Sequence, residues 1–126
     1  MAKSIKKEYP LEEEEQKNFI LYLDDLILKG KDIKYSSIPN STFTKSWKQK
    51  RKNKEQGLRA GLPDLFLIVN NRPFFIEMKR INGKLSDCQK DWINAINECE
   101  KLQAFVCYGC EEAKNIVYNF IRNKEG

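Results

Sequence analysis

Three charged residues interrupt the most apolar part of this chain. Asp64, Glu77 and Lys79 bound or end two short runs of β-branched and aromatic residues, and such runs are typical of strands. Side chains alternate along a strand, so Glu77 and Lys79 share one face. The Asn70-Asn71 pair between the runs is typical of a tight turn, because asparagine is favoured in such turns. The pattern predicts a β-hairpin that carries its charges at the open end.

The length of the turn decides which charges face each other. If the loop is Asn70-Asn71 alone, Asp64 lies opposite Glu77. If the loop extends to Pro73, Asp64 lies opposite Lys79. Either register gathers the three side chains into one cluster, because opposed residues on neighbouring strands lie roughly 5 Å apart at Cβ.

Two carboxylates at that separation repel each other and need a compensating positive charge. A divalent cation with oxygen ligands supplies it, and a nearby lysine can stabilise a negatively charged oxygen beside the metal. The cluster therefore predicts metal-assisted hydrolysis of a phosphodiester. A structural ion pair is the alternative, and the apolar strand that precedes Glu77 favours the active site.

A basic stretch lies directly upstream of this cluster. It predicts a surface that delivers a polyanion to Asp64, and a solvated basic helix is the alternative. Trp47 lies within the stretch, Phe43 lies just before it, and Glu55 is its one acid. Its cations are Lys45, Lys48, Lys50, Arg51, Lys52, Lys54 and Arg59.

Length and composition bound the class of protein. A chain of 126 residues suits one compact domain, and we expect residues 1–126 to form it. Hydrophobic residues make up 40% of the chain, whereas the mean hydropathy of −0.67 indicates a polar surface. No run of eighteen apolar residues exists and Met1–Lys7 has no apolar core. We therefore expect a soluble, cytoplasmic protein that does not contact a membrane.

The chain has no histidine, which excludes histidine bases, serine-histidine triads and histidine-bound zinc. Two of its four cysteines, Cys107 and Cys110, have the spacing of a zinc ligand pair, but no second such pair follows. We interpret Cys88, Cys99, Cys107 and Cys110 as free thiols in a reducing compartment.

The remaining pattern predicts the elements that position the cluster. Their order favours an α/β fold in which helices flank a mixed sheet and the last strand returns parallel after a helical crossover. We expect a helix from Pro10 to Gly30, an edge strand within Asp32–Pro39 closed by Pro39-Asn40-Ser41, a basic helix over Lys45–Gln56, the hairpin, a helix from Ser86, a strand over Gln103–Tyr108 and a helix over Glu111–Arg122.

Two of these helices carry polar residues that could reach the cluster. Glu12 and Gln16 extend the apolar row of the first helix, although Glu13 is nearly as good a choice and a helix-dipole role is the alternative. Ser86 and Gln89 form a capping box. One face of that helix is predicted to comprise Cys88, Trp92, Ala95, Ile96 and Cys99, with Trp92 in the core.

The cluster and its surroundings resemble a known family. Pro63-Asp64, followed after twelve intervening residues by Glu77-Met78-Lys79, resembles the PD-(D/E)XK nuclease superfamily. Gly57, Gly61 and the Gly83–Gln89 segment look more narrowly like its VRR-NUC branch, the virus-type replication-repair nucleases. The resemblance covers Gly57 to about Tyr108 well and the N-terminal helix loosely. It implies a restriction-endonuclease-like mixed β-sheet core flanked by α-helices.

The resemblance also implies roles for single residues. The Met78 backbone carbonyl would be a metal ligand beside Asp64 and Glu77, and Glu12 would lie near the metal. Gln89 would position a water or Lys79. Lys84, in the segment that follows, is expected to contact nucleic acid together with the basic stretch.

We therefore expect a single VRR-NUC-like domain that acts as a Mg²⁺- or Mn²⁺-dependent endonuclease on DNA, with one or two ions. Small stand-alone relatives imply a homodimer, branched or structured DNA, nicking or Holliday-junction-type cleavage that leaves a 5′-phosphate, and a phage origin with action in a bacterial host. Two alternatives remain open at this point: a non-catalytic DNA-binding module on a nuclease fold, and a nuclease directed at RNA.

Overall fold

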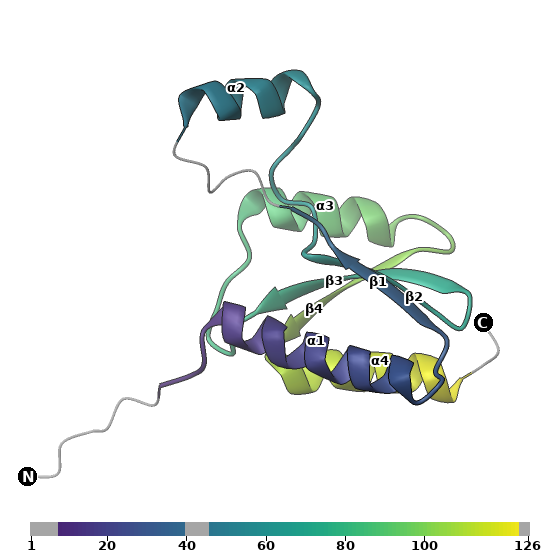
Figure 1. Cartoon of the computed structure of the whole chain (residues 1–126). Coiled ribbons are helices and arrows are strands. Elements are labelled where there is room, and N and C mark those ends of the chain that lie inside the picture. The colour runs from purple at the N-terminus through teal and green to yellow at the C-terminus, as the bar shows by residue number, and fades with distance from the viewer. Residues whose placement is uncertain (1–7, 40–45, 124–126) are drawn as a thin grey trace, which may run out of the picture.

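The computed structural model describes residues 8–39 and 46–123, and its centre is a four-stranded mixed sheet (Figure 1). In the sheet the strand order is β1 (Ile33–Ser37), β2 (Leu65–Val69), β3 (Arg72–Lys79) and β4 (Gln103–Tyr108). The first three strands are antiparallel neighbours, whereas β4 runs parallel to β3. The α/β prediction with a parallel last strand is therefore confirmed.

Helices cover both faces of the sheet. α1 (Glu12–Leu28) and α4 (Cys110–Arg122) lie side by side on one face of the sheet. α3 (Asp87–Asn97), which connects β3 to β4 along the chain, covers the other face (Figure 1). The fourth helix, α2 (Trp47–Glu55), stands away from the sheet. Within the described ranges, no helix is long and apolar enough to cross a membrane.

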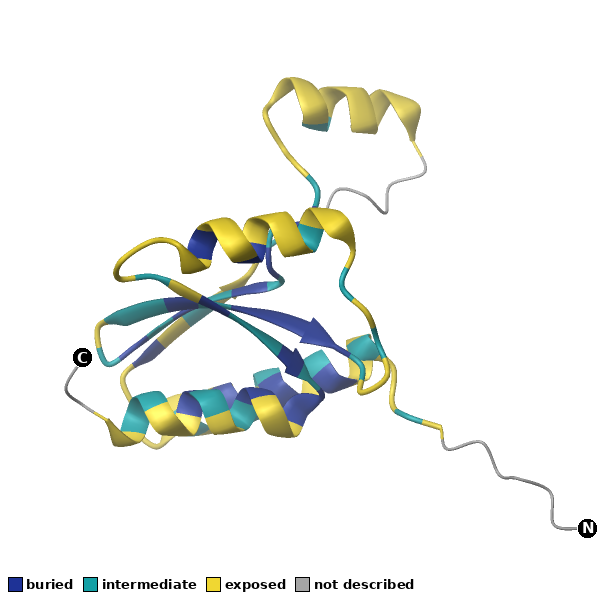
Figure 2. Ribbon diagram, turned by 180° about the vertical axis from the view of Figure 1, so that it is seen from behind, coloured by how far each residue is buried: buried dark blue, intermediate teal, exposed yellow. Residues whose placement is uncertain are grey.

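The core has two parts, one on each face of the sheet, which Figure 2 shows as the dark blue inner surfaces. Strand alternation divides β3 as expected, because Phe74 and Ile76 point toward α1 and α4 while Phe75 points toward α3. The larger cluster includes Phe19, Leu23, Leu65, Leu67, Val69, Phe74, Ile76, Met78, Ala113 and Val117. The smaller cluster consists of Ile93, Ile96 and Ala104.

The hairpin uses the shorter of the two turns considered above. Val69 pairs with Arg72 and Leu65 with Ile76, so the loop is Asn70-Asn71 alone. Both asparagines have positive φ, 51° and 64°, which is the conformation of the type I′ turn that matches strand twist. Continuing this register by one residue sets Asp64 opposite Glu77.

The predicted apolar face of α3 is wrong in four of its five positions. Only Ile96 is buried, and it shares the sheet contact with Ile93, which the prediction left out. Branched aliphatic side chains bury more apolar area against the strands than cysteine or alanine can. The prediction that Trp92 lies in the core is also wrong, because this side chain is 36% exposed. The residues left exposed are Cys88, Trp92, Ala95 and Cys99.

Other expectations fall close to the structure or outside its described residues. The edge strand, the hairpin strands and the strand at Gln103–Tyr108 are all present. Lys45, Phe43 and the Asn40-Ser41 turn lie outside the described residues. All four cysteines are free thiols, and burial raises the pKa of the Cys107 thiol to about 12.

The Asn70-Asn71 turn should tolerate glycine and resist alanine. Asn71 is exposed and makes its contribution through backbone conformation. Asn71→Ala should lower the free energy of unfolding by about 1 kcal/mol, because alanine lacks the short polar side chain that lets asparagine adopt φ 64° at low cost. Asn71→Gly should stay within about 0.5 kcal/mol of the wild type. Urea denaturation of both variants tests this, and equal losses would show that the turn conformation does not matter.

Candidate active site

Asp64 is held in place by backbone contacts to the strands on both sides of β2. Its side-chain Oδ2 accepts a hydrogen bond from the Met78 N–H at 2.7 Å, and its carbonyl oxygen accepts one from the Ile38 N–H at 2.7 Å. Pro63 before it is fully buried. The Asp64 carboxylate therefore cannot swing away from the end of β3.

Glu77 is the most unusual residue of the chain. It is 1% exposed, and neither carboxylate oxygen has a hydrogen-bond partner among the described residues. Its pKa is raised from an ordinary 4.5 to about 9, first by burial and then by the adjacent Asp64 carboxylate, whereas the Lys79 ammonium lowers it by less. A buried acid without a partner is costly, and such groups concentrate at functional sites.

The donor set at this position fits a hard divalent cation. Two unpartnered oxygens of Glu77 and the carboxylate of Asp64 are oxygen ligands, which Mg²⁺ and Mn²⁺ prefer. Across the described parts of the chain, no group of three or more His, Cys, Asp or Glu side chains is arranged to hold a metal. The remaining ligands would be backbone oxygen, such as the Met78 carbonyl, and water, which Mg²⁺ usually retains.

Lys79 ends β3 beside the two carboxylates and has an acidic partner from α1. The whole residue is 8% exposed, and its Nζ lies 3.9 Å from Glu12 Oε2. The pKa of Glu12 is raised by burial, which outweighs the opposing effect of Lys79. The structure thus brings Glu12 to the site through Lys79, whereas Glu13 lies on the outer side of the helix and pairs with Lys17.

Two contacts that sequence reasoning missed fix the start of α1 at this site. Arg80 Nη2 donates a hydrogen bond to the Tyr9 carbonyl at 2.7 Å, which ties the chain before α1 to the end of β3. Glu15 is buried, and its Oε2 would lie 2.8 Å from a Cβ placed on Gly109, the residue that precedes α4. Neither contact has a local sequence signal, because each joins segments that are far apart in the chain.

Tyr108 is a further residue at the site that the sequence did not single out. It is the register partner of Lys79 in the parallel β3–β4 pair, so both side chains point to the same face at the same end of the sheet. A cavity of about 270 Å³ opens there, lined by Gly83, Lys84, Leu85, Lys90 and Tyr108. The signal that could have found Tyr108 is its place at the carboxyl end of the predicted parallel strand.

Gln89 makes the capping box that the sequence predicts. Its Oε1 accepts a hydrogen bond from the Ser86 N–H at 2.8 Å, and its own N–H donates to Ser86 Oγ at 3.2 Å. One lone pair of Oε1 is thus used at the helix start, and the side-chain NH2 group of Gln89 can still donate a hydrogen bond to a water.

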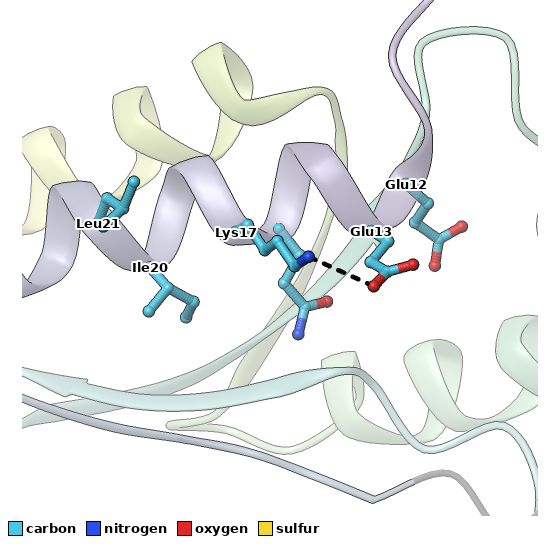
Figure 3. Close-up of a pocket in the computed structure, with 6 residues that line it drawn as sticks. Glu12, Glu13, Lys17, Ile20 and Leu21 are labelled. Carbon is cyan, nitrogen blue, oxygen red and sulfur yellow. Dashed lines mark ion pairs between the residues drawn. The ribbon is translucent and has the colours of Figure 1, made fainter.

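A cavity along α1 meets the site only at Glu12. About 890 Å³ of open space lies along the outer row of α1, as Figure 3 shows, with Glu12 at one end of the labelled residues and Ile20 and Leu21 at the other. Asp64, Glu77 and Lys79 do not line it. This cavity is therefore separate from the two carboxylates.

The basic residues lie on and after α2. Lys48, Lys50, Arg51, Lys52 and Lys54 are all exposed on this helix. Arg59 is exposed as well, and its Nη1 donates to the Lys54 and Leu58 carbonyls, so this guanidinium closes the end of α2. The Lys84 side chain instead lies at the cavity beside Tyr108.

The metal-free protein should become less stable than its Glu77→Gln variant as pH rises. The pKa of Glu77 is about 9 in the folded chain and near 4.5 in the unfolded chain, so the folded chain keeps this proton to higher pH. The proton therefore contributes its full share to the free energy of unfolding below pH 4.5, and this contribution is lost as the pH rises to 9. In EDTA, urea denaturation at pH 5, 7 and 9 should show a gap that grows past about 1 kcal/mol, since one pKa unit corresponds to roughly 1.4 kcal/mol.

Added Mg²⁺ or Mn²⁺ should reverse this difference, because a cation at the site stabilises the folded wild type and not the amide variant. Parallel pH profiles for the two proteins would contradict the assignment of Glu77 as an ionisable, unpartnered group.

Comparison with known proteins shows which family the chain belongs to. A solved structure described as a VRR_NUC domain protein superposes with a TM-score of 0.67 at 20% sequence identity, over 91% of each chain. At that identity the likeness shows the fold. No curated protein matches the chain. The model of the VRR-NUC domain matches residues 7–111, which is most of the chain, and this protein therefore belongs to the VRR-NUC family of nucleases.

Proposed function

We propose that this protein is a metal-dependent endonuclease that hydrolyses DNA phosphodiester bonds. The observation that carries the proposal is Glu77, whose two buried oxygens lack partners beside Asp64 at the end of β3. Membership of a nuclease family sets the reaction class.

The residues present would divide the work as follows. Asp64, Glu77 and the Met78 carbonyl would hold Mg²⁺ or Mn²⁺, in one or two ions, and when bound the cation lowers the pKa of a water and offsets the negative charge of the phosphate. Lys79 donates a hydrogen bond to the phosphate oxygen on which charge develops, or to the attacking water. Glu12 keeps the Lys79 ammonium at the site through its ion pair.

A non-catalytic DNA-binding module is the competing function, and the acid pair counts against it. Two carboxylates at the place where phosphates must lie would repel the polyanion without a cation. A surface built only for binding gains nothing from burying Glu77, which costs stability. The preference for branched or structured DNA and a homodimeric state belong to the same proposal and rest on family resemblance.

Cleavage should require both the metal and Lys79. We expect the wild type to cleave supercoiled plasmid or a four-way junction in Mg²⁺ or Mn²⁺ and to be inactive in EDTA. Asp64→Ala and Lys79→Ala should each lower the rate at least about 100-fold, because each removes charge stabilisation at the reacting phosphate. Gel assays of single-turnover cleavage, with binding measured in parallel, provide the readout.

The matched control for Lys79→Ala is Lys101→Ala, which removes an exposed lysine from the loop before β4. This variant should keep wild-type activity. Full activity in Lys79→Ala would remove the proposed site, and binding without cleavage in every metal would establish the non-catalytic module.

Neutralising the basic helix should weaken DNA binding in a salt-dependent way. The triple variant Lys50→Gln, Arg51→Gln and Lys52→Gln should reduce the slope of log K against log salt by up to about 3, since each phosphate contact contributes roughly 0.9. Binding titrations between about 50 and about 200 mM salt measure this slope, because phosphate contacts change the affinity strongly in that range. An unchanged slope would assign α2 to solubility.

The control for this variant neutralises Lys31 and Lys34, which are exposed at the opposite end of the sheet from Lys79. Their loss should leave the slope unchanged within about 1, because they lie away from the proposed path of the DNA.

A further inference from the structure

α2 is the one described helix that packs on nothing. It has no buried residue and makes no contact with another helix or strand of the described chain, and Figure 2 shows it almost wholly in the colour of exposed residues. Most helices in proteins are held by an apolar face against the core. α2 has no such face, so packing within the described part of the chain does not account for its residues.

The helix nevertheless carries a large aromatic side chain in water. Trp47, at its first position, is 83% exposed. Residues three, four and seven positions later lie on the same helix face, and all are cations: Lys50, Arg51 and Lys54. Lys50 Nζ lies 5.2 Å from the centre of the indole ring. One face of α2 thus combines a flat ring with three positive charges.

Repulsion within α2 shows which kind of partner it needs. Lys48 lies four residues before Lys52 and Lys50 four before Lys54, and like charges at this spacing destabilise a helix. At nine residues the helix is also shorter than an isolated helix that is stable in water. A polyanion would relieve this repulsion, whereas a second copy of a chain with net charge +5 would add to it.

The connection between α2 and the active site is firmly fixed. Trp92 Nε1 donates a hydrogen bond to the Ala60 carbonyl at 3.1 Å. Gly61 has φ 101° and packs so closely on α3 that a Cβ there would lie 2.6 Å from the Cys88 carbonyl group. Asp64 follows three residues after Gly61, so the chain that leads from α2 to the candidate site is anchored just before Asp64.

We propose that α2 recognises unpaired bases, with the Trp47 ring stacking on an exposed base while Lys50, Arg51 and Lys54 contact the neighbouring phosphates. In a continuous duplex both faces of each base are covered by its neighbours, so an indole can stack only where a base is unpaired or unstacked. α2 then favours junctions, flaps and single strands over plain duplex. This inference rests on the proposed function for the identity of the nucleic acid and adds the feature that is recognised.

Binding experiments test this without cleavage. In EDTA, on the Lys79→Ala background, a fluorescently labelled single-stranded oligonucleotide and a blunt-ended duplex of the same strand length are titrated with protein. Trp47→Ala should weaken binding to the single strand at least about fivefold, the lower end for loss of one stacked base, and change binding to the duplex less than about twofold. Trp47→Phe should recover part of the loss.

Intrinsic fluorescence gives a second readout. Of the two tryptophans, Trp47 should be quenched by the single strand, and this quenching should disappear in Trp47→Ala while Trp92 remains. The matched control is Tyr118→Ala, which removes a 53% exposed aromatic from α4 on the other face of the sheet and should change neither affinity. Because Trp47 packs on no other element, Trp47→Ala should unfold at the same urea concentration as its parent.

The outcomes separate this inference from the proposed function. Equal losses on both oligonucleotides, or no loss on either, would overturn the stacking role. A Trp47-dependent blue shift with phosphatidylserine vesicles and no response to the single strand would overturn it in favour of a membrane surface. If Trp47→Ala weakens binding to the single strand alone while the wild type cleaves nothing in any metal, the proposed nuclease function fails. The inference that Trp47 stacks on unpaired bases then still stands.

Discussion

The free energy needed to keep Glu77 buried beside Asp64 constrains everything around the end of β3. A buried carboxyl group without a hydrogen-bond partner, next to the Asp64 carboxylate, destabilises the metal-free fold, so the surrounding contacts must hold the two groups together. The two-residue turn sets the register, the Met78 and Ile38 N–H groups hold Asp64, and the Gly109 N–H donates to the Lys79 carbonyl at 2.8 Å. These hydrogen bonds and the strand register thus offset the cost of burying Glu77.

The features that the sequence predicts well are those with local causes. Asn70-Asn71 needs no distant partner to favour its turn, and Ser86 with Gln89 caps a helix by contacts three residues apart. Strand alternation then follows from geometry alone, which is why the cluster of Asp64, Glu77 and Lys79 could be placed from the sequence. The resemblance to the VRR-NUC nucleases rests partly on this cluster, and the match of the family model confirms it.

The features that the sequence predicts poorly depend on how the elements dock. The buried face of α3 is set by the shape of the sheet beneath it, so Ile93 replaced the expected Trp92. Four consecutive glutamates cannot show that Glu12 meets Lys79 while Glu15 is buried against Gly109. Arg80 and Tyr108 acquire their positions from segments far away in the chain, and periodicity contains no information about such contacts.

The isolation of α2 has a consequence for how this protein can change over generations. Because α2 contacts no other described helix or strand, it can accept substitutions, insertions or replacement without loss of folding free energy. The condition is that Gly61 and the hydrogen bond from Trp92 to Ala60 still hold the chain that follows α2. Residues that bury Glu77 have no such freedom. In the nuclease proposed above, substitutions in α2 would therefore change the contacted nucleic acid while the carboxyl groups at the end of β3 stay as they are.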